Sequence, residues 1–118
     1  LSGSAGVSVN YPLLSGNRFA PLAESQLKGY GGGILTLRVG SKARAMDVLG
    51  KLKLATIASN IGDVRTLVIY PATTLYLHNT AEEREAAGVF DDTIRVSVGI
   101  EDAADLIEDF TGAIEGTL

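Results

Sequence analysis

The sequence predicts a small α+β domain whose sheet is covered on one side by helices, and two observations predict it. Short segments rich in β-branched residues alternate side chains with period two, while other segments place apolar residues at helical spacing. The two kinds of segment follow each other in the order β-α-β-α-β-β-α-β-α, which is typical of a sheet with helices packed against it. With 118 residues, the chain is long enough for one domain with one hydrophobic core.

Five segments are predicted to be strands. The clearest covers residues 34–39, where leucine and valine alternate with other residues. Residues 93–98 are β-branched or small except for one arginine, Arg95. The shorter strands are expected at 7–9, 55–58 and 66–70.

Four segments are predicted to be helices, and capping residues mark where three of them begin. These residues are Ser41, Thr80 and Asp102, and Thr80 forms a capping-box pattern with Glu83. The helices are expected over 19–27, 42–52, 81–87 and 103–115. The apolar residues on their core-facing sides are expected to be Phe19, Leu22, Ala23 and Leu27; Ala45, Val48, Leu49 and Leu52; and Ala103, Ile107, Phe110 and Ile114.

Composition and charge exclude several classes of site. Fourteen acidic against ten basic residues give a net charge of −4 without a Lys/Arg patch, which argues against a nucleic-acid surface. The absence of cysteine removes disulfides and thiolate sites, and a single histidine, His78, argues against a metal site. No apolar run approaches the roughly 20 residues of a membrane span, and the first residues lack the pattern of a signal peptide. We therefore expect a cytoplasmic protein that does not contact a membrane; because it begins with Leu1, it is either processed or part of a longer chain.

Arg95 is the most informative residue of the chain. On a strand it shares a face with Thr93 and Ser97, opposite the apolar residues. A buried guanidinium is costly unless it meets an anion. It therefore either pairs with a carboxylate of a neighbouring element or binds the carboxylate of an acidic ligand in bidentate geometry. Composition and spacing alone favour the internal ion pair, which is the commoner outcome.

The other motifs favour structural roles. The glycine run 29–33 precedes a strand instead of opening a helix, so it does not fit a phosphate-binding loop. Ser59 and Ser97 have no base at a suggestive spacing. The polar turn 60–65 lies between two strands, a position that sometimes borders a binding site. The acidic residues near the C-terminus are expected to cap a helix and form its solvated face; they are Glu101, Asp102, Asp105, Glu108 and Asp109.

A series of short motifs runs along nearly the whole chain, from about residue 9 to residue 114. They are Val9–Pro12, Gly29–Leu35, Leu52–Leu54, Asn60–Asp63, Pro71–Thr74, Glu82–Arg84, Ala87–Val89 and Ile94–Glu101. Taken in order, they resemble the C-terminal domain of the pyridoxal-phosphate enzymes of cysteine and methionine metabolism. This family includes cystathionine γ-synthase, cystathionine lyases, methionine γ-lyase and O-acetylhomoserine sulfhydrylase, and the resemblance implies the small C-terminal domain of a fold-type I transferase.

The resemblance also implies roles for two residues. Arg95 would bind the α-carboxylate of the amino-acid substrate, and Asn60 would lie beside it. The turn 60–63 is most similar to the O-acetylhomoserine sulfhydrylase branch, which replaces the acyl group of a homoserine ester by sulfide or a thiol in methionine and homocysteine biosynthesis. One departure is Tyr76, which stands where this branch commonly has histidine, and His78 does not align with that position.

The resemblance further implies that residues 1–118 form one C-terminal domain of a longer enzyme. Its large N-terminal domain would hold pyridoxal 5′-phosphate, and the complete enzyme would be a tetramer. None of the lysines of this chain has the flanking pattern of a Schiff-base lysine; they are Lys28, Lys42, Lys51 and Lys53. We therefore expect no catalytic, cofactor-binding or metal-binding residue here, and no catalysis by this chain alone. The alternatives are a methionine γ-lyase or cystathionine γ-synthase/lyase type of member, or a non-catalytic amino-acid-binding module.

Overall fold

The computed structural model describes residues 1, 3–4 and 6–118, and these contain a five-stranded sheet in the order β1-β2-β5-β4-β3. The strands are β1 (Ser8–Asn10), β2 (Ile34–Arg38), β3 (Thr56–Ile57), β4 (Leu67–Ile69) and β5 (Thr93–Ser97). Neighbouring strands are antiparallel except β3 and β4, which are parallel. Each predicted strand is confirmed, and β5 lies in the centre of the sheet between β2 and β4.

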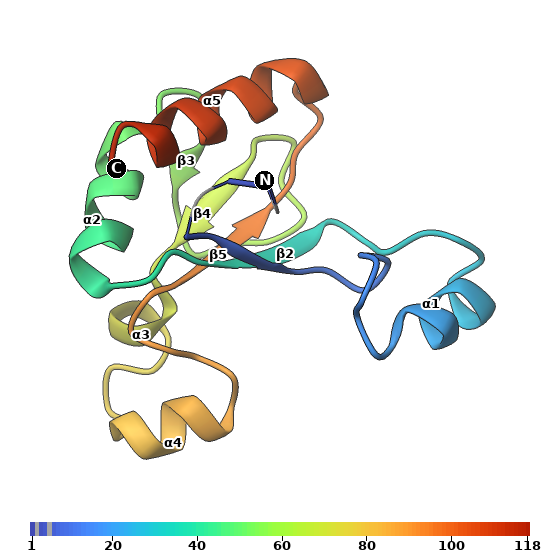
Figure 1. Cartoon of the computed structure of the whole chain (residues 1–118), viewed down its shortest axis with the longest axis horizontal. Helices are drawn as coiled ribbons and strands as arrows, with labels where there is room; N and C mark the ends of the chain where they lie inside the picture. The colour runs from blue at the N-terminus through green and yellow to red at the C-terminus, as the bar shows by residue number, and fades with distance from the viewer. Residues whose placement is uncertain (2, 5) are drawn as a thin grey trace.

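The helices of the described residues are α1 (Ala20–Gln26), α2 (Lys42–Lys51), α3 (Pro71–Thr74), α4 (Ala81–Ala86) and α5 (Ala103–Glu115). Figure 1 shows α2 and α5 together on one side of the sheet, α3 and α4 below it, and α1 on an arm that leads away from the sheet. The predicted α+β class is confirmed. The short helix α3 is not predicted, because Pro71 ends a strand pattern but is also tolerated in the first turn of a helix.

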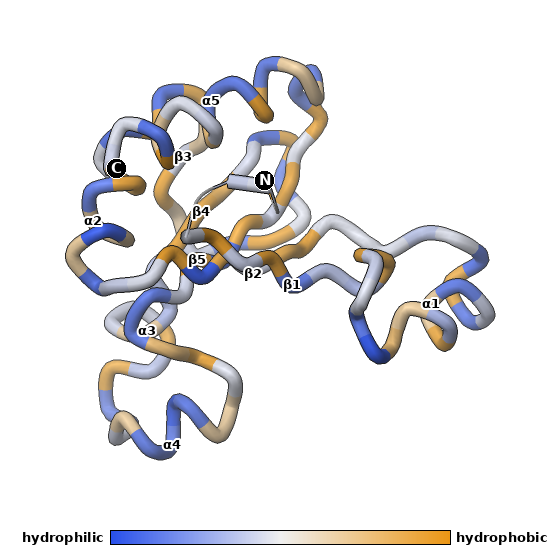
Figure 2. Tube along the Cα trace, in the orientation of Figure 1, coloured by the Kyte–Doolittle hydropathy of each residue, from blue (hydrophilic) through white to orange (hydrophobic). Residues whose placement is uncertain are grey.

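The hydrophobic core lies between the sheet and the pair α2 and α5. The strand residues that point into it include Leu37, Ile94 and Val96, which are at most 2% exposed. Figure 2 shows hydrophobic residues in the central strands and mostly hydrophilic residues in α4. Because side chains alternate across a strand, burying Ile94 and Val96 under the helices places Arg95 on the other face of the sheet.

The three predicted helix caps are present. Ser41 Oγ accepts a hydrogen bond from the Arg44 N–H (3.1 Å), and Asp102 Oδ1 accepts one from the Ala104 N–H (2.9 Å). Thr80 forms the predicted capping box with Glu83. Each cap satisfies backbone donors that have no partner within the helix, and so fixes the residue at which the helix begins.

The predicted buried stripe is wrong for part of α5. The buried residues are Leu106, Phe110, Ala113 and Ile114, whereas Ile107 is 59% exposed and Ala103 is also exposed. Leu106 and Ile107 are adjacent apolar residues, so spacing alone did not determine which of them faces the sheet. In the structure Leu106 belongs to the hydrophobic core, together with Val96 and Phe110.

The apolar face predicted for the first helix is also wrong as a core element. Phe19 is 53% exposed, Leu22 51% and Leu27 49%, and only Ala23 is buried. The reason is the position of α1, which lies on the arm and not on the sheet (Figure 1).

The glycine run 29–33 lies at the base of this arm, where the backbone is close to Tyr11. Tyr11 Oη donates to the Gly32 carbonyl (2.9 Å), and a Cβ at Gly31 would lie 2.5 Å from the Tyr11 ring. The absence of a side chain at Gly31 therefore allows the Tyr11 ring to pack against the backbone here.

The end of the sheet between β2 and β5 is held by Asp92, which is 6% exposed. Its carboxylate accepts hydrogen bonds from Arg38 Nε and from the Gly40 N–H, both at 2.9 Å, while the Arg38 guanidinium stacks 3.9 Å from the Phe90 ring centroid. Burial raises the pKa of Asp92, but the hydrogen bonds from Gly40 and Arg38 and the positive charge of Arg38 outweigh it, and the net pKa is lowered.

Replacing Asp92 by asparagine should lower the free energy of unfolding by about 1–3 kcal/mol at neutral pH, because a buried acceptor of a charged donor is lost. A group with a lowered folded pKa stabilises the protein above its unfolded value and loses this contribution as the pH falls through the folded value. The difference between wild type and Asp92→Asn should therefore shrink below pH 3.8. Urea unfolding of both proteins at neutral pH and below pH 3.8 measures this difference in the free energy of unfolding.

The matched control is the neighbouring Asp91, whose ion pair with Arg84 is exposed, with 66% of the Asp91 side chain accessible. Asp91→Asn should cost less than about 1 kcal/mol. Equal losses for the two variants would contradict the anchoring role of Asp92.

Candidate functional site

The face of the sheet opposite α2 and α5 carries a polar row in its central strands. In register across β1, β2 and β5 lie Asn10, Thr36 and Arg95, and Ile69 of β4 continues the row. Directly paired residues of antiparallel strands project from the same face, so these side chains are neighbours. The partly buried Arg95 therefore lies between Thr36 and Ile69 on this face, which also carries Arg38 at the other end of β2.

Arg95 forms no hydrogen bond and no ion pair with any residue that the structure describes. The ion pairs of the described residues involve Arg38, Lys51, Arg65 and Arg84 instead. The internal ion pair that composition favoured for Arg95 is thus absent from the described part of the chain. Its guanidinium retains the donor geometry that binds a carboxylate in a bidentate manner.

The turn between β3 and β4 contacts Ser97, two residues from Arg95 on β5. The Gly62 N–H donates to Ser97 Oγ (3.4 Å), and Ser97 projects from the same face of β5 as Arg95. Asn60 stands exposed at the start of this turn. The structure therefore brings the segment that contains Asn60 next to the strand that carries Arg95.

The far end of the same turn is fixed by a cluster of hydrogen bonds. Glu101 accepts from the Thr66 N–H at 2.8 Å and from the Thr66 hydroxyl at 2.7 Å. The Thr66 hydroxyl in turn accepts from the Gly99 N–H at 2.9 Å, and the Ile100 N–H donates to the Val64 carbonyl at 2.9 Å. The hydrogen bond from the Thr66 N–H is the largest cause of a lowered pKa of Glu101, against a smaller effect of burial that raises it.

Two of the acidic residues predicted to be solvated have structural partners instead. Glu101 binds Thr66, and Asp109 accepts backbone N–H bonds from Lys53, Leu54 and Ala55 at 2.8, 2.9 and 3.1 Å. The prediction of a solvated face is wrong for these two, because both carboxylates satisfy backbone donors of a neighbouring turn. Asp102 caps α5 as predicted.

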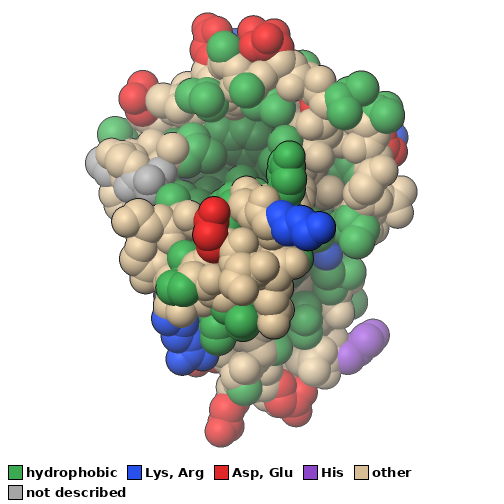
Figure 3. Space-filling view, turned by 90° about the vertical axis from the view of Figure 1, so that its right-hand side faces the viewer, with side chains coloured by type: hydrophobic (Ala, Val, Ile, Leu, Met, Phe, Trp, Pro, Cys, Tyr) green, Lys and Arg blue, Asp and Glu red, His purple; other side chains and the backbone are tan. Residues whose placement is uncertain are grey.

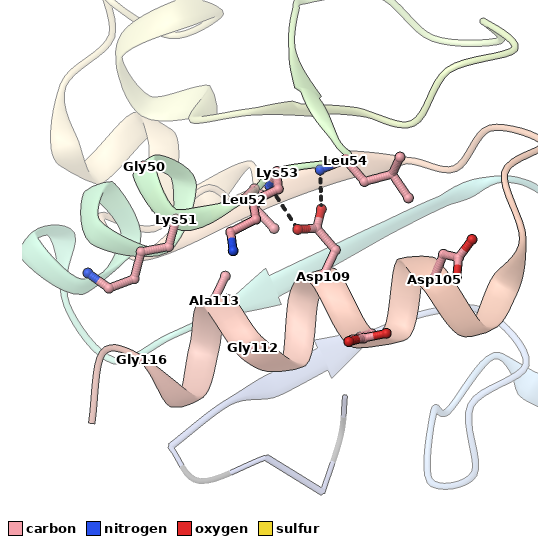
Figure 4. Close-up of a pocket in the computed structure, with 11 residues that line it drawn as sticks. Gly50, Lys51, Leu52, Lys53, Leu54, Asp105, Asp109, Gly112, Ala113 and Gly116 are labelled. Atoms are coloured by element: carbon pink, nitrogen blue, oxygen red, sulfur yellow. Dashed lines mark hydrogen bonds between the residues drawn. The ribbon is translucent and has the colours of Figure 1, made fainter.

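One recess has a volume of about 760 Å³ and lies between the end of α2 and α5. Figure 4 shows that its one central carboxylate, Asp109, points to the backbone of Lys53 and Leu54. This recess is on the helix side of the sheet, away from Arg95. Its size therefore does not make it the candidate site, since its central polar group is already satisfied.

A second recess, of about 190 Å³, is lined almost entirely by apolar side chains of β5 and α5, including Val96, Leu106 and Phe110. Figure 3 shows this hydrophobic hollow on the side of the molecule toward which α1 projects. It offers no charged group to a ligand.

The other residues considered in the sequence analysis do not form a site with one another in the part of the chain that the structure describes. His78 is exposed, and the described residues contain no cluster of acidic or histidine side chains that could hold a metal ion. Ser59 is exposed and Ser97 is buried as the acceptor for Gly62, so neither has a base beside it. Tyr76 is partly buried and packs against the hydrophobic core.

Comparison with known proteins identifies the family. The family model described as Cys/Met metabolism PLP-dependent enzyme matches residues 3–115. The chain belongs to this family. Pyridoxal phosphate is therefore the cofactor of the family to which the chain belongs, and the resemblance read from the motifs is confirmed.

Several relatives cover nine-tenths of this chain. It is 44% identical over 108 residues to homocysteine synthase of Schizosaccharomyces pombe, covering 91% of this chain and 25% of that protein. It is 40% identical over 111 residues to O-succinylhomoserine sulfhydrylase of Mycobacterium tuberculosis, covering 90% of this chain and 27% of that protein. It is 42% identical over 105 residues to cystathionine gamma-lyase of Bacillus subtilis, covering 89% and 27%.

The fold agrees with a solved structure of the family. A protein from Campylobacter jejuni, named as an O-acetylhomoserine (thiol)-lyase and containing N′-pyridoxyl-lysine-5′-monophosphate, superposes with a TM-score of 0.91 at 34% identity. The match covers 97% of this chain and 28% of that one. This chain therefore spans about a quarter of the length of the relatives that it matches.

The residues of this chain do not themselves fit pyridoxal phosphate. All of its lysines are exposed, and Lys51 is in an ion pair with Asp47 at 2.6 Å. A lysine that binds the aldehyde needs a desolvated position and a charged partner for the ring, which these positions lack. Among the described residues, no helix has the length and hydropathy that crossing a bilayer requires.

The close contact at Gly99 gives a test of how the turn is held. A Cβ on Gly99 would overlap the backbone of Val64 and Arg65, so Gly99→Ala should push the turn away and lower the free energy of unfolding by about 1–3 kcal/mol. Chemical denaturation measures this loss. A Cβ on Gly112, inside α5, meets no atom within 4 Å, so the control Gly112→Ala should be neutral or stabilise by up to about 1 kcal/mol. A neutral Gly99→Ala would show that the turn is not closely packed on β5.

Proposed function

We propose that this chain is the C-terminal, substrate-binding domain of a pyridoxal-phosphate enzyme of sulfur amino-acid metabolism. The observation that carries the proposal is Arg95, a partly buried guanidinium on the central strand without a partner among the described residues. Its role is to bind the α-carboxylate of an amino-acid substrate. Asn60, at the start of the neighbouring turn, is proposed to complete this anion site.

A guanidinium suits this role because of its shape and charge. It presents parallel N–H donors that match both oxygens of a carboxylate, and it keeps its charge at every physiological pH. Its place on the central strand holds it more rigidly than a surface loop does. A substrate fixed at its carboxylate loses orientational freedom before reaction, which lowers the entropic part of the barrier.

The reaction we propose is replacement at the γ-carbon of an O-acylhomoserine. The bond between the γ-carbon and the ester oxygen breaks, the carboxylic acid leaves, and sulfide or a thiol forms a new carbon–sulfur bond, which gives homocysteine or a thioether. Similarity to homocysteine synthase at 44% identity and to O-succinylhomoserine sulfhydrylase at 40% identity supports this choice. The turn Asn60–Asp63, which resembles the sulfhydrylase branch, supports it as well.

Pyridoxal phosphate supplies the electron withdrawal that such chemistry needs. Because the lysines of this chain do not fit it, we propose that a separate N-terminal domain of the complete enzyme holds the cofactor. This chain contributes substrate binding and orientation, in an enzyme that we propose to be a cytoplasmic tetramer.

A γ-lyase is the second candidate. Cystathionine gamma-lyase of Bacillus subtilis is 42% identical to this chain, which is nearly the value for homocysteine synthase. Tyr76, at the position where the sulfhydrylase branch commonly has histidine, also leaves the reaction open to this alternative. Assays of the full-length protein with O-acetylhomoserine and sulfide, and separately with cystathionine, distinguish the two by their products.

Arg95→Ala in the full-length protein should raise KM for the amino-acid substrate at least about 30-fold, because a desolvated charge-assisted pair is lost. The absorbance of bound pyridoxal phosphate should stay unchanged, since Arg95 binds the substrate and not the cofactor. Arg95→Lys should be intermediate, because lysine keeps the charge but not the bidentate geometry. Steady-state kinetics and absorption spectra provide both readings.

The control is Lys53→Gln, which removes an exposed positive charge on the helix side of the sheet. Its KM should match wild type. An unchanged KM in Arg95→Ala would remove the carboxylate-binding role. Calorimetry with O-acetylhomoserine on the 118-residue chain tests the non-catalytic alternative, since a binding module retains affinity without the rest of an enzyme.

A further inference from the structure

We infer that Thr66 and Glu101 are positioning residues that hold the turn 60–65 against β5 and so set the geometry of the anion site. This inference rests on the proposed function of Arg95 and Asn60. Neither Thr66 nor Glu101 is proposed to touch the substrate. Together they set the distance between the turn and β5.

The turn is not held in place by hydrophobic burial. Its apolar residues point to solvent, with Ile61 58% and Val64 63% exposed. Asn60 and Gly62 are exposed as well, and Gly62 adopts a positive φ of 72°, which glycine tolerates. A segment with so little buried apolar surface depends on hydrogen bonds for its position.

Three of the hydrogen bonds that join the turn to β5 and the residues after it involve Thr66, and the Ile100 N–H adds another to the Val64 carbonyl at 2.9 Å. The Thr66 side chain links two elements at once, because its hydroxyl donates to Glu101 at 2.7 Å and accepts from the Gly99 N–H at 2.9 Å. Its own N–H donates to the second oxygen of Glu101 at 2.8 Å. Thr66 is 0% exposed, so water does not compete for these bonds. The contact from Gly62 to Ser97 is longer, at 3.4 Å, and is the weaker of the attachments.

The carboxylate of Glu101 accepts hydrogen bonds from Thr66 and forms no ion pair with Arg95. Hydrogen bonds from Thr66 stabilise the carboxylate, while the nearby Asp63 opposes its ionisation. Asp63 is itself bound by the Arg65 N–H at 2.9 Å. The carboxylates of Asp63 and Glu101 thus have partners within the turn and its anchor, and neither forms an ion pair with Arg95.

The test is Thr66→Val in the full-length protein, which keeps the side-chain volume and removes the hydroxyl. We expect amide hydrogen exchange of residues 60–65 to accelerate at least about tenfold, and KM for O-acetylhomoserine to rise about 5- to 100-fold. The absorbance of bound pyridoxal phosphate should not change. Thr66→Ser restores the hydroxyl and should return both values to within about threefold of wild type.

Two further variants separate positioning from general stability. Glu101→Gln keeps one acceptor oxygen, and combined with Thr66→Val it should be no worse than the more harmful single variant, because both remove the same cluster. Ser41→Ala removes the cap of α2 on the far side of the sheet and should cost about 1 kcal/mol of stability without changing KM or exchange in the turn.

Each outcome decides the inference. Unchanged exchange in Thr66→Val, or failure of Thr66→Ser to restore it, overturns the positioning role whatever the fate of Arg95. Faster exchange with unchanged KM, while Arg95→Ala raises KM, overturns the inference and leaves the proposed function standing. If Arg95→Ala itself leaves KM unchanged, the proposed function fails and the inference about the anion site fails with it. Should Thr66→Val not fold, Glu101→Gln carries the same readings.

Discussion

The structure depends on the alternation of side chains along its central strand, β5. Burying Ile94 and Val96 under α2 and α5 places the partly buried Arg95 on the opposite face of the sheet. A buried guanidinium is costly unless it meets an anion, and Arg95 has no ion pair with any residue that the structure describes. The carboxylates of Asp92 and Glu101 have other partners: Asp92 accepts hydrogen bonds from Arg38 and Gly40, and Glu101 accepts from Thr66.

The two faces of the sheet differ in how their side chains are packed. One face buries Ile94 and Val96 beneath α2 and α5 and supplies the hydrophobic stability. The other carries Arg95 beside the buried Ile69, and the turn that contains Asn60 is joined to it by hydrogen bonds, with its own apolar residues exposed. The recess of about 760 Å³ lies on the helix side, away from Arg95.

The chain belongs to the Cys/Met metabolism family of PLP-dependent enzymes, and the proposed role of the polar face rests on this membership. The chain spans about a quarter of the relatives that it matches, and its exposed lysines do not fit the cofactor of the family. Under the proposed function, the domain contributes a rigid anion site, and the reacting groups come from the remainder of the enzyme. The identity values for the sulfhydrylase and lyase relatives are close, so similarity alone does not choose between the two reactions.

The sequence by itself determined the α+β class, the five strands and the caps at Ser41, Thr80 and Asp102, because these depend on local periodicity and on the chemistry of single residues. Only the tertiary structure decided that Leu106 and not Ile107 enters the core, and that α1 leaves its apolar face exposed. It also decided that Glu101 binds Thr66 and leaves Arg95 without a partner among the described residues. These outcomes depend on which segments, distant along the chain, come into contact, and a local pattern does not contain that information.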